Sequence, residues 1–249
     1  MTDRLKGKVA LVTGAASGFG AATARRFAQE GARVLVCDLN AEQGEQIADE
    51  IGGLAMRCDV GDSAQVAQAV QTATAKWGRL DIVVNNAGIT HRNKPAGEVT
   101  EAEFDSLYRV NVKSLFHMNQ HATPVFRRQG GGVFVNVAST TGVRPGPGLC
   151  WYSASKGAVI TASKGLALEL AKDQIRVCVI NPMIGETALL EQFMGMPDTP
   201  ENRQRFLARI PLGRFTQPLD VAHAAVFLAS DEAAFLTGVC LDVDGGRNI

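Results

Sequence analysis

The sequence predicts an α/β protein: a single doubly wound Rossmann domain, with a parallel sheet of about seven strands and helices on both faces. Short apolar, β-branched runs alternate with longer helix-like segments along the whole chain. The apolar runs are near-continuous, which is typical of parallel strands that are covered on both faces. No linker, internal repeat or low-complexity tract divides the 249 residues, so we expect residues 1–249 to form one domain.

The expected elements follow from these runs. Strands rich in Val, Ile and Leu are predicted at 9–14, 32–38, 54–60, 80–88, 132–139, 175–182 and 238–246. Helices are predicted at 18–30, 41–51, 63–77, 101–128, 151–171 and 219–229. An insertion at 183–215, which contains "MGMPDTPENRQRF", breaks the rhythm. Long excursions of this kind usually cover a binding site or join an interface, so we interpret 183–215 as a substrate lid.

Composition argues against several classes of protein. Lys+Arg and Asp+Glu both number 25, whereas a nucleic-acid or anionic-membrane binder would usually show a basic excess. No stretch approaches the ~20 apolar residues of a membrane span, and no signal peptide is recognisable. The scattered cysteines form no CxxC pair, which favours free thiols over a zinc site or a disulfide framework. We therefore expect a cytoplasmic protein with no nucleic-acid or membrane partner.

A glycine-rich turn, "TGAASGFG" at 13–20, joins the first strand to the first helix. Gly14, Gly18 and Gly20 let the backbone turn tightly and approach a pyrophosphate, and the helix N-terminus offers N–H groups and a positive dipole end. The spacing G-x-x-x-G-x-G differs from the dinucleotide fingerprint G-x-G-x-x-G. Its position in a βαβ unit favours phosphate binding over a turn that serves packing alone.

Asp38 closes the second strand, and no Arg or Lys follows it directly in "CDLNAEQ". A carboxylate there can accept hydrogen bonds from both adenosine ribose hydroxyls and repels a 2′-phosphate, so we expect NAD and not NADP. Capping of the next helix is a compatible role for Asp38. Asp59 and Val60 end the third strand, where the adenine edge would lie. "NNAG" at 85–88 ends the fourth, and by itself is only a turn signal.

Tyr152 and Lys156 stand four residues apart in "WYSASKGAV", with small residues between them. At this helical spacing the phenol and the ammonium share one face. A free phenol titrates near pH ~10, and a neighbouring cation lowers that pKa. The pair therefore predicts a proton donor and acceptor for neutral pH, although the same spacing also occurs by chance on helix surfaces.

Together these motifs resemble the short-chain dehydrogenase/reductase family over about residues 6–246. "TGAASGFG" is similar to the family's cofactor loop, "NNAG" to its sheet-stabilising motif and "YSASK" to its Tyr-x-x-x-Lys. Asn111 in "RVNVKS" and Ser139 in "NVAST" resemble its helical asparagine and its catalytic serine. The resemblance implies an oxidoreductase that interconverts a secondary alcohol and its ketone by hydride transfer, with a sugar, polyol or cyclic alcohol as candidate substrates.

The resemblance also implies residue roles. Tyr152 would be the general acid/base, Lys156 would lower its pKa and hold the nicotinamide ribose, Ser139 would bind the substrate oxygen, and Asn111 would anchor a proton path. Besides Tyr152 and Lys156, the expected cofactor contacts are Gly14, Ser17, Gly18, Phe19, Gly20, Asp38, Asp59, Val60, Asn86, Ala87, Gly88, Pro182, Ile184 and Thr187. Family members commonly form tetramers, so the resemblance implies a homotetramer built through the helices at 101–128 and 152–171.

One departure from the family pattern follows the sixth strand. The family usually has Pro-Gly and then a threonine, whereas this sequence reads "NPMIGET". Thr187 keeps the spacing of the residue that meets the carboxamide. Met183 replaces the glycine, and we expect its bulk to narrow the pocket near the nicotinamide.

Other histidines and an arginine suggest weaker sites. His117 and His121 stand at helical spacing that can chelate zinc, but no acidic or cysteine partner is near in sequence, so we expect no metal. His91 and Arg144 are candidate substrate contacts near the mouth of the site. Arg144 could meet an anionic or polyhydroxylated substrate, or simply be a surface-loop residue.

Two alternative functions stay open. An NADPH-dependent 3-oxoacyl carrier-protein reductase resembles this chain over its length, although Asp38 and the zero net charge count against it. A non-catalytic dinucleotide-binding protein is the other, and the intact set of Asn111, Ser139, Tyr152 and Lys156 counts against that one.

Overall fold

The computed structural model describes residues 3–187 and 189–249. Within them, seven parallel strands form one sheet in the order β3-β2-β1-β4-β5-β6-β7. The strands are β1 (Val9–Thr13), β2 (Arg33–Asp38), β3 (Leu54–Arg57), β4 (Ile82–Asn85), β5 (Gly132–Val137), β6 (Ile175–Pro182) and β7 (Cys240–Val243). The strand order reverses between β1 and β4, which is where sheets of this kind bind ligands. The predicted doubly wound α/β fold is confirmed.

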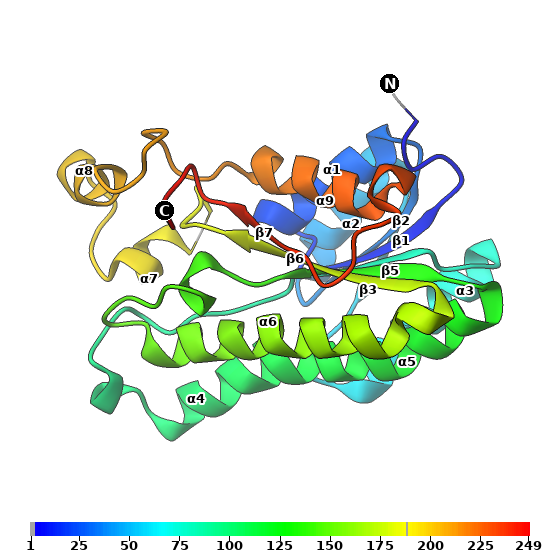
Figure 1. Ribbon diagram of the computed structural model, residues 1–249, viewed down its shortest axis with the longest axis horizontal. Helices are drawn as coiled ribbons and strands as arrows, with labels where there is room; N and C mark the ends of the chain where they lie inside the picture. The colour runs from blue at the N-terminus through cyan, green and yellow to red at the C-terminus, as the bar shows by residue number, and fades with distance from the viewer. Residues whose placement is uncertain (1–2, 188) are drawn as a thin grey trace.

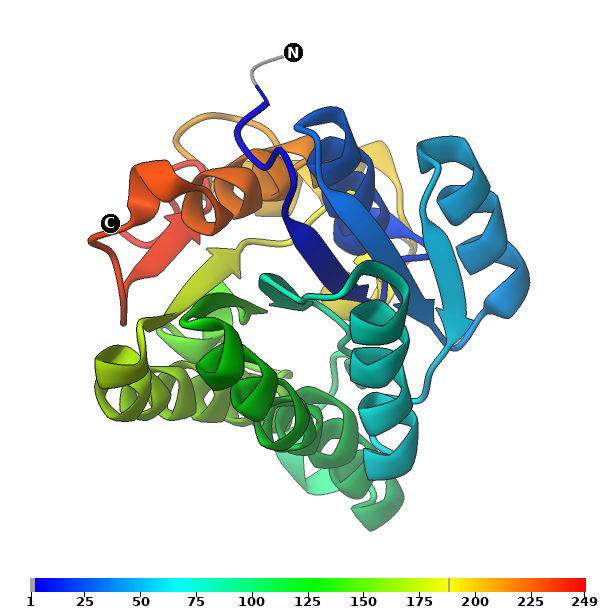
Figure 2. The ribbon, with the colours of Figure 1, turned by 90° about the vertical axis from the view of Figure 1, so that its right-hand side faces the viewer.

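Helices cover both faces of this sheet (Figure 1, Figure 2). One face carries α1 (Gly18–Gln29), α2 (Ala41–Ile51) and α9 (Pro218–Ala229), and the other carries α3 (Ser63–Trp77), α4 (Glu101–Tyr108), α5 (Ser114–Gln129) and α6 (Cys150–Leu170). The short α7 (Leu190–Met194) and α8 (Pro200–Leu207) lie beyond the carboxyl ends of the strands. Single helical turns are η1 (Ala96–Glu98), η2 (Arg109–Lys113), η3 (Thr140–Gly142), η4 (Ala171–Asp173) and η5 (Asp231–Ala233). No helix in the described ranges combines the length and the apolar character needed to cross a membrane.

Two buried apolar layers hold the helices on the sheet. On β1, Ala10 and Val12 join the layer under α1 and α9, whereas Val9 and Leu11 join the layer under α3 and α5. Burial of each larger aliphatic side chain contributes about 1.5–3 kcal/mol. Because both faces of each strand are covered, the strands appear in the sequence as continuous apolar runs.

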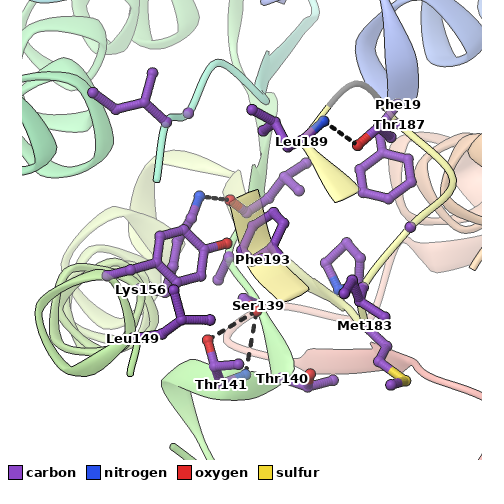
Figure 3. Close-up of a pocket in the computed structure, with 18 of the residues that line it drawn as sticks. Phe19, Ser139, Thr140, Thr141, Leu149, Lys156, Met183, Thr187, Leu189 and Phe193 are labelled. Atoms are coloured by element: carbon purple, nitrogen blue, oxygen red, sulfur yellow. Dashed lines mark hydrogen bonds between the residues drawn. The ribbon is translucent and has the colours of Figure 1, made fainter. Parts of the chain in front are cut away.

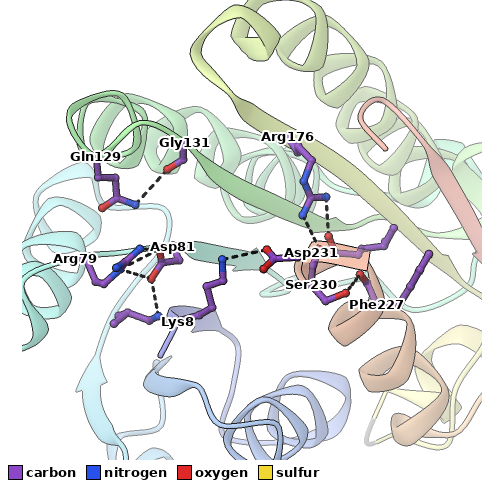
Figure 4. A network of polar contacts seen from close by, with 11 residues as sticks. Lys8, Arg79, Asp81, Gln129, Gly131, Arg176, Phe227, Ser230 and Asp231 are labelled. Atoms are coloured by element: carbon purple, nitrogen blue, oxygen red, sulfur yellow. Dashed lines mark hydrogen bonds and ion pairs between the residues drawn. The ribbon is translucent and has the colours of Figure 1, made fainter. Parts of the chain in front are cut away.

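A polar network ties the amino-terminal edge of the sheet (Figure 4). The Asp81 carboxylate accepts the backbone N–H of Val9 at 2.8 Å and a two-pronged contact from Arg79, with the shortest N–O distance 2.6 Å. Across the sheet, the Arg176 guanidinium donates to the carbonyl oxygen of Ser230 at 3.2 Å. These contacts satisfy polar groups at the edge where the strands begin.

The structure corrects several expected bounds. The helix expected at 101–128 is interrupted by η2, a π-helical turn, which separates α4 from α5. The strands expected at 54–60, 80–88 and 238–246 are shorter: all three end earlier, and the last two also begin two residues later. The insertion at 183–215 folds into α7 and α8 around its own apolar cluster, which includes Leu190, Met194, Ile210 and Phe215.

Candidate active site

A cavity of about 1100 Å³ opens at the carboxyl edge of the sheet. Loops after β1, β2, β3, β4, β5 and β6 contribute to its wall, together with α6 and the 183–215 insertion. Of the predicted site residues, all but Gly20 and Asn111 line it. Residues from very distant parts of the sequence therefore share one space, as expected at this edge of a doubly wound sheet.

The glycine loop is held against the loop after β4. The Asn86 side chain donates to the carbonyl oxygens of Thr13 and Gly14, at 2.8 and 3.0 Å. Gly14 has φ +61°, and a Cβ on it would lie 2.8 Å from the Cα of Ala87, so close packing as well as backbone conformation requires glycine here.

Gly20 lies behind this loop and does not line the cavity, contrary to its predicted cofactor contact. A Cβ at Gly20 would collide with the carbonyl oxygen of Gly14 and with Nδ2 of Asn86. Its part is therefore to let α1 approach the loop. Gly18, by contrast, is on the wall, with φ +53°, beside Thr187.

Asp38 faces the cavity from the end of β2 and also braces the glycine loop. Its Oδ2 accepts the N–H of Ala16 at 2.9 Å, and its Oδ1 accepts the N–H of Asn40 at 3.0 Å. The cap of α2 is Asn40, whose side chain accepts the N–H of Gln43, so Asp38 is not the helix cap that the sequence allowed. Asp38 thus holds a carboxylate at the edge of the loop.

Asp59 lines the same wall beside Val60, and the N–H of the preceding Cys58 donates to the carbonyl oxygen of Asp38 at 2.8 Å. Its carboxylate forms an ion pair with Arg109, with an N–O distance of 2.8 Å, and accepts the N–H of Gly61. This pairing links the loop after β3 to the π-helical turn that follows α4.

Asn111 sits in that π-helical turn and is buried behind the cavity wall. Its Oδ1 accepts the N–H of Ile89 at 2.9 Å, and its Nδ2 donates to the carbonyl oxygen of Ile89 and to Oγ of Ser155, both at 3.0 Å. The side-chain amide therefore ties the loop after β4 to α6. It stands close to Lys156, because a Cβ on Gly88 would lie 3.4 Å from Oδ1 of Asn111 and 3.1 Å from Nζ of Lys156.

Tyr152 and Lys156 lie on the cavity side of α6, both more than nine-tenths buried. The ammonium of Lys156 is 5.9 Å from the centre of the Tyr152 ring and donates to the carbonyl oxygen of Val137 at 2.9 Å. Burial lowers the pKa of Lys156 to about 8. Burial raises the pKa of Tyr152 to about 12, against the opposing effect of its hydrogen bond with Ser139. The expected lowering of the tyrosine pKa is therefore not present in this structure, because desolvation outweighs the neighbouring groups.

Ser139 lies two residues after the end of β5 and is the N-cap of η3. Its Oγ accepts hydrogen bonds from the N–H and the hydroxyl of Thr141, at 3.2 and 3.1 Å, and it also bonds with Tyr152. Figure 3 shows Ser139 and Lys156 on one side of the cavity and Phe19 and Thr187 across from them. The arrangement places two hydroxyl groups and an ammonium around one point of the wall.

The 183–215 insertion closes the other side. Pro182, Met183, Ile184 and Thr187 line the cavity, and the ring of Phe19 packs so closely on Gly185 that a side chain there would collide with it. Met183 is half-buried and packs against the apolar cluster of the insertion. Its side chain therefore adds apolar wall next to Pro182, as its bulk predicts.

The remaining candidates separate clearly. His91 is buried with Nδ1 2.8 Å from the carbonyl oxygen of Arg92 and does not line the cavity, whereas Arg144 does. His121 hydrogen-bonds Oγ of Ser63 at 2.9 Å. Among residues 3–187 and 189–249, no group of three or more His, Cys, Asp or Glu side chains is placed to hold a metal.

Much of the wall had no signal in the sequence. It includes Asn93, Leu149, Leu189, Phe193, Met194, Met196, Phe206, Arg209 and Arg247. These residues come from the segments that follow β4, β5, β6 and β7, and their polar, apolar and cationic types are ordinary in surface loops. Only the unusual length of the 183–215 insertion could have pointed to some of them.

The cavity fits a nicotinamide dinucleotide. The first turn of α1 contains no acidic residue, and Ser17 at its start makes no capping hydrogen bond, so backbone N–H groups are available beside the glycine wall. Asp38 suits a ribose at one end, and the polar cluster of Ser139, Tyr152 and Lys156 surrounds the other. The backbone N–H groups that could bind a pyrophosphate thus lie between the end of the cavity suited to adenosine and the end that holds Ser139, Tyr152 and Lys156.

Known proteins resemble this chain over its full length. The profile of a family described as enoyl-(acyl carrier protein) reductase matches residues 14–248. The 4-formylbenzenesulfonate dehydrogenase TsaC1/TsaC2 of Comamonas testosteroni is 64% identical, over 98% of this chain and 99% of that protein. D-threitol dehydrogenase of Mycolicibacterium smegmatis is 41% identical, over 99% and 95%. The crystal structure of 3-ketoacyl-(acyl-carrier-protein) reductase from Brucella melitensis complexed with NADH is 46% identical over 98% and 100%, with a TM-score of 0.93.

Proposed function

Since the chain belongs to the short-chain dehydrogenase/reductase family, an oxidoreductase family acting on CH–OH groups with a nicotinamide dinucleotide, we propose that it uses NAD(H). We propose that it interconverts a secondary alcohol and its ketone, with Tyr152 as general acid/base. The observation that carries the proposal is the shared wall of one cavity: Asp38 at one end, and Ser139, Tyr152 and Lys156 at the other.

The preference for NAD rests on Asp38. Its carboxylate is fixed by the N–H groups of Ala16 and Asn40, and it lines the cavity at the edge of the glycine loop. A ribose with free hydroxyls can hydrogen-bond to such a carboxylate, whereas a 2′-phosphate would be repelled by it. Each oxygen has a second lone pair for the ribose, so bracing the loop and binding the cofactor are compatible.

When bound, the nicotinamide accepts or supplies the hydride. Tyr152 exchanges the proton with the substrate oxygen, and Ser139, hydrogen-bonded to Tyr152, orients that oxygen. Lys156 holds its ammonium 5.9 Å from the ring centre and stabilises the phenolate that forms when the proton leaves. Asn111 positions this group by joining the loop after β4 to α6.

Burial raises the pKa of Tyr152 to about 12, so the phenol of the protein alone is suited to giving a proton. A positive charge beside the phenol lowers this pKa. Oxidation of an alcohol, which needs the phenolate, is therefore favoured at higher pH than reduction of a ketone. We expect the two directions to show opposite pH trends.

Two variants test the proposal. Tyr152→Phe should bind NADH as the wild type does and lose at least about a thousandfold in turnover, as expected when a general acid is removed. Asp38→Asn should reduce the preference for NADH over NADPH about tenfold or more, measured by fluorescence titration of both dinucleotides. Clearly tighter binding of NADPH by the wild type would contradict the cofactor assignment, and full activity of Tyr152→Phe would contradict the mechanism.

The second candidate is a 3-oxoacyl carrier-protein reductase. It is favoured by the 46% identity with the Brucella melitensis reductase, whose structure contains NADH, so an NAD site does not count against it as strongly as the sequence suggested. Reduction of acetoacetyl thioesters, compared with that of simple aromatic and aliphatic ketones under the same conditions, separates the two candidates.

The 64% identical relative is named for 4-formylbenzenesulfonate, a benzene ring that carries an aldehyde group and an anionic sulfonate group. This relative supports an aromatic carbonyl or alcohol as the substrate class of the present chain. The apolar part of the cavity wall, with Phe193 and Phe206, is consistent with it.

We further propose that residues 1–249 form one domain, and that the protein is a cytoplasmic homotetramer. The single sheet supports the first proposal. Exposed apolar side chains on the two long helices, Phe116 on α5 (56% exposed) and Leu168 on α6 (84%), support association through those helices. Light scattering that gave the mass of a monomer would exclude the tetramer.

A further inference from the structure

We propose that Arg144, Arg209 and Arg247 form a binding site for the anionic group of an aryl substrate, at the end of the cavity remote from Asp38 and Asp59. This inference rests on the proposed function, because it assigns one end of the same cavity. It goes further in naming the charged part of the substrate and the residues that select it.

The three arginines come from three segments that contact one another. Arg144 follows η3, and its backbone N–H donates to the carbonyl oxygen of Thr140 at 2.8 Å, which keeps it near Ser139. Its guanidinium lies 3.5 Å from the carbonyl oxygen of Arg247, in the loop after β7. Arg209 follows α8 and lines the same cavity.

The segment that carries Arg209 is anchored to the segment that carries Arg247. The N–H of Leu212 donates to the carbonyl oxygen of Gly245 at 3.1 Å. A Cβ on Gly245 would lie 2.8 Å from Cγ2 of Ile210, so the two backbones approach as closely as glycine allows. The three guanidinium-bearing loops are therefore held together by contacts that do not use the guanidinium groups of Arg209 and Arg247.

The negative and the positive charges of the cavity wall lie in different parts of it. In the described part of the chain, the carboxylates of the wall belong to Asp38 and Asp59, at the adenosine end. Lys94, the other surface cation on the wall, is already paired with Glu103 at 2.8 Å. No ion pair involving any of the three arginines is found within residues 3–187 and 189–249.

Carboxylates close to the C-terminal loop are occupied elsewhere. Asp242 accepts from the side chains of Asn181 and Asn248, at 2.8 and 3.1 Å, and Asp244 accepts the N–H groups of Gly246 and Asn248. The positive end of the cavity is thus left for an external anion. Guanidinium groups suit carboxylates and sulfonates because they donate paired, planar hydrogen bonds.

The cavity wall next to Tyr152 and within the insertion is apolar and partly aromatic. Phe193 meets the Tyr152 ring edge to face, with ring centres 5.1 Å apart. Met183, Met196 and Phe206 continue this wall within the insertion. Thioether and ring edges pack well on aromatic rings, so the body that fits between the two polar ends is a ring and not a polyol.

The test uses a matched pair of ketones, 4-acetylbenzoate and the neutral 4-acetylbenzamide, which have nearly the same shape. Reduction by the NADH-loaded enzyme gives kcat/KM, and calorimetric titration into the NAD-loaded enzyme, where no reduction occurs, gives affinity. The variants are Arg144→Gln, Arg209→Gln and Arg247→Gln, each with its lysine counterpart. Arg33→Gln serves as control, since Arg33 is exposed at the start of β2.

We expect the benzoate to bind about tenfold more tightly than the benzamide at low ionic strength. Each glutamine variant should lower the benzoate affinity and kcat/KM about three- to tenfold, mainly through KM, and leave the benzamide values within about twofold. Lysine variants should retain most of the preference, and added salt should weaken it. Arg33→Gln should behave as the wild type, with folding of all variants checked by circular dichroism.

Equal affinity for the two ketones, or a benzoate preference that survives in all three glutamine variants, would overturn the proposal. Tight, arginine-dependent binding of the benzoate without its reduction would support this site and count against the proposed reaction instead. An arginine-dependent preference for acetoacetyl thioesters, with no discrimination within the aryl pair, would assign the cluster to acyl thioesters and overturn the aryl anion.

Discussion

Replacing Lys156 by methionine should make the protein more stable at neutral pH while abolishing its activity. Lys156 is 4% exposed, and its ammonium has one protein hydrogen-bond acceptor in the described structure, the carbonyl oxygen of Val137 at 2.9 Å. Methionine keeps much of the aliphatic stem and removes the buried charge. A residue placed for catalysis at a cost in stability is a common feature of active sites.

The magnitude follows from the lysine pKa. Burial lowers it from 10.5 to about 8, which corresponds to ~3 kcal/mol of lost stability when the lysine is charged in both folded and unfolded chains. Losing the hydrogen bond to the Val137 carbonyl costs about 1–2 kcal/mol in the variant. We therefore expect Lys156→Met to raise the free energy of unfolding by ~1–2 kcal/mol at pH 7.

The pH dependence has a definite sign. Below pH 8 the ammonium is charged in both states, so the destabilisation is fully present. Between pH 8 and 10.5 the folded chain loses this proton before the unfolded chain does, so the wild type gains stability as the pH rises. The advantage of Lys156→Met should shrink across this window. Burial raises the pKa of Tyr152 to about 12, so its phenol stays protonated in both folded proteins up to pH 10 and cancels in the difference.

Urea unfolding of the cofactor-free proteins at one protein concentration, at pH 7 and at pH 10, measures both effects. Lys76→Met on α3 is the matched control, because Lys76 is exposed and its loss should change stability by less than ~0.5 kcal/mol. If Lys156→Met were destabilised by the same amount at both pH values, the inference that burial of this charge opposes folding would be refuted.

Three further substitutions probe parts of the frame around the site. Gly20→Ala should weaken NADH binding about tenfold in a fluorescence titration, because its Cβ would collide with the Gly14 carbonyl oxygen; unchanged affinity would contradict this packing role. Asn93→Ala should raise KM for a ketone severalfold and leave NADH affinity unchanged, because the Asn93 side chain donates to the carbonyl oxygen of Phe193 at 3.1 Å and ties the loop after β4 to α7. An equal loss of cofactor affinity would argue against a local effect. Glu30→Ala should lower the free energy of unfolding by about 2–3 kcal/mol in urea, because the buried Glu30 carboxylate pairs with two arginines at 2.7 Å. The kcat should not change, since Glu30 is not on the cavity wall.

Local sequence patterns were enough to predict most of the helices and strands. The helix at 63–77 and the strand at 175–182 have the predicted bounds, because the apolar periodicity and the end signals of each lie within the segment itself. Asp62 at the N-cap and Gly78 at the C-cap of α3 are such signals. The glycine turn after β1 was likewise placed correctly by its own residues.

Predictions failed where a distant residue determines the backbone. The helix expected at 101–128 breaks at a π-helical turn, in which Asn111 bonds Ile89 and Ser155, 22 and 44 residues away in the chain. The strand expected at 80–88 ends at Asn85, since Asn86 turns to bond the glycine loop. The pKa of Tyr152 also moved against expectation, because burial on all sides is a property of the assembled cavity.

Patterns of neighbouring residues were enough to predict the glycine loop, the acidic residue at the end of β2 and the Tyr152–Lys156 pair, and the alternation of such patterns along the chain predicted the fold class. Which surface-loop residues meet across the cavity could be seen only in the folded chain. Arg144, Arg209 and Arg247 are ordinary loop arginines in the sequence, and they share a wall because β5, α8 and β7 deliver their loops to the same edge of the sheet. Spatial proximity between distant segments depends on packing of the whole chain, which local patterns do not contain.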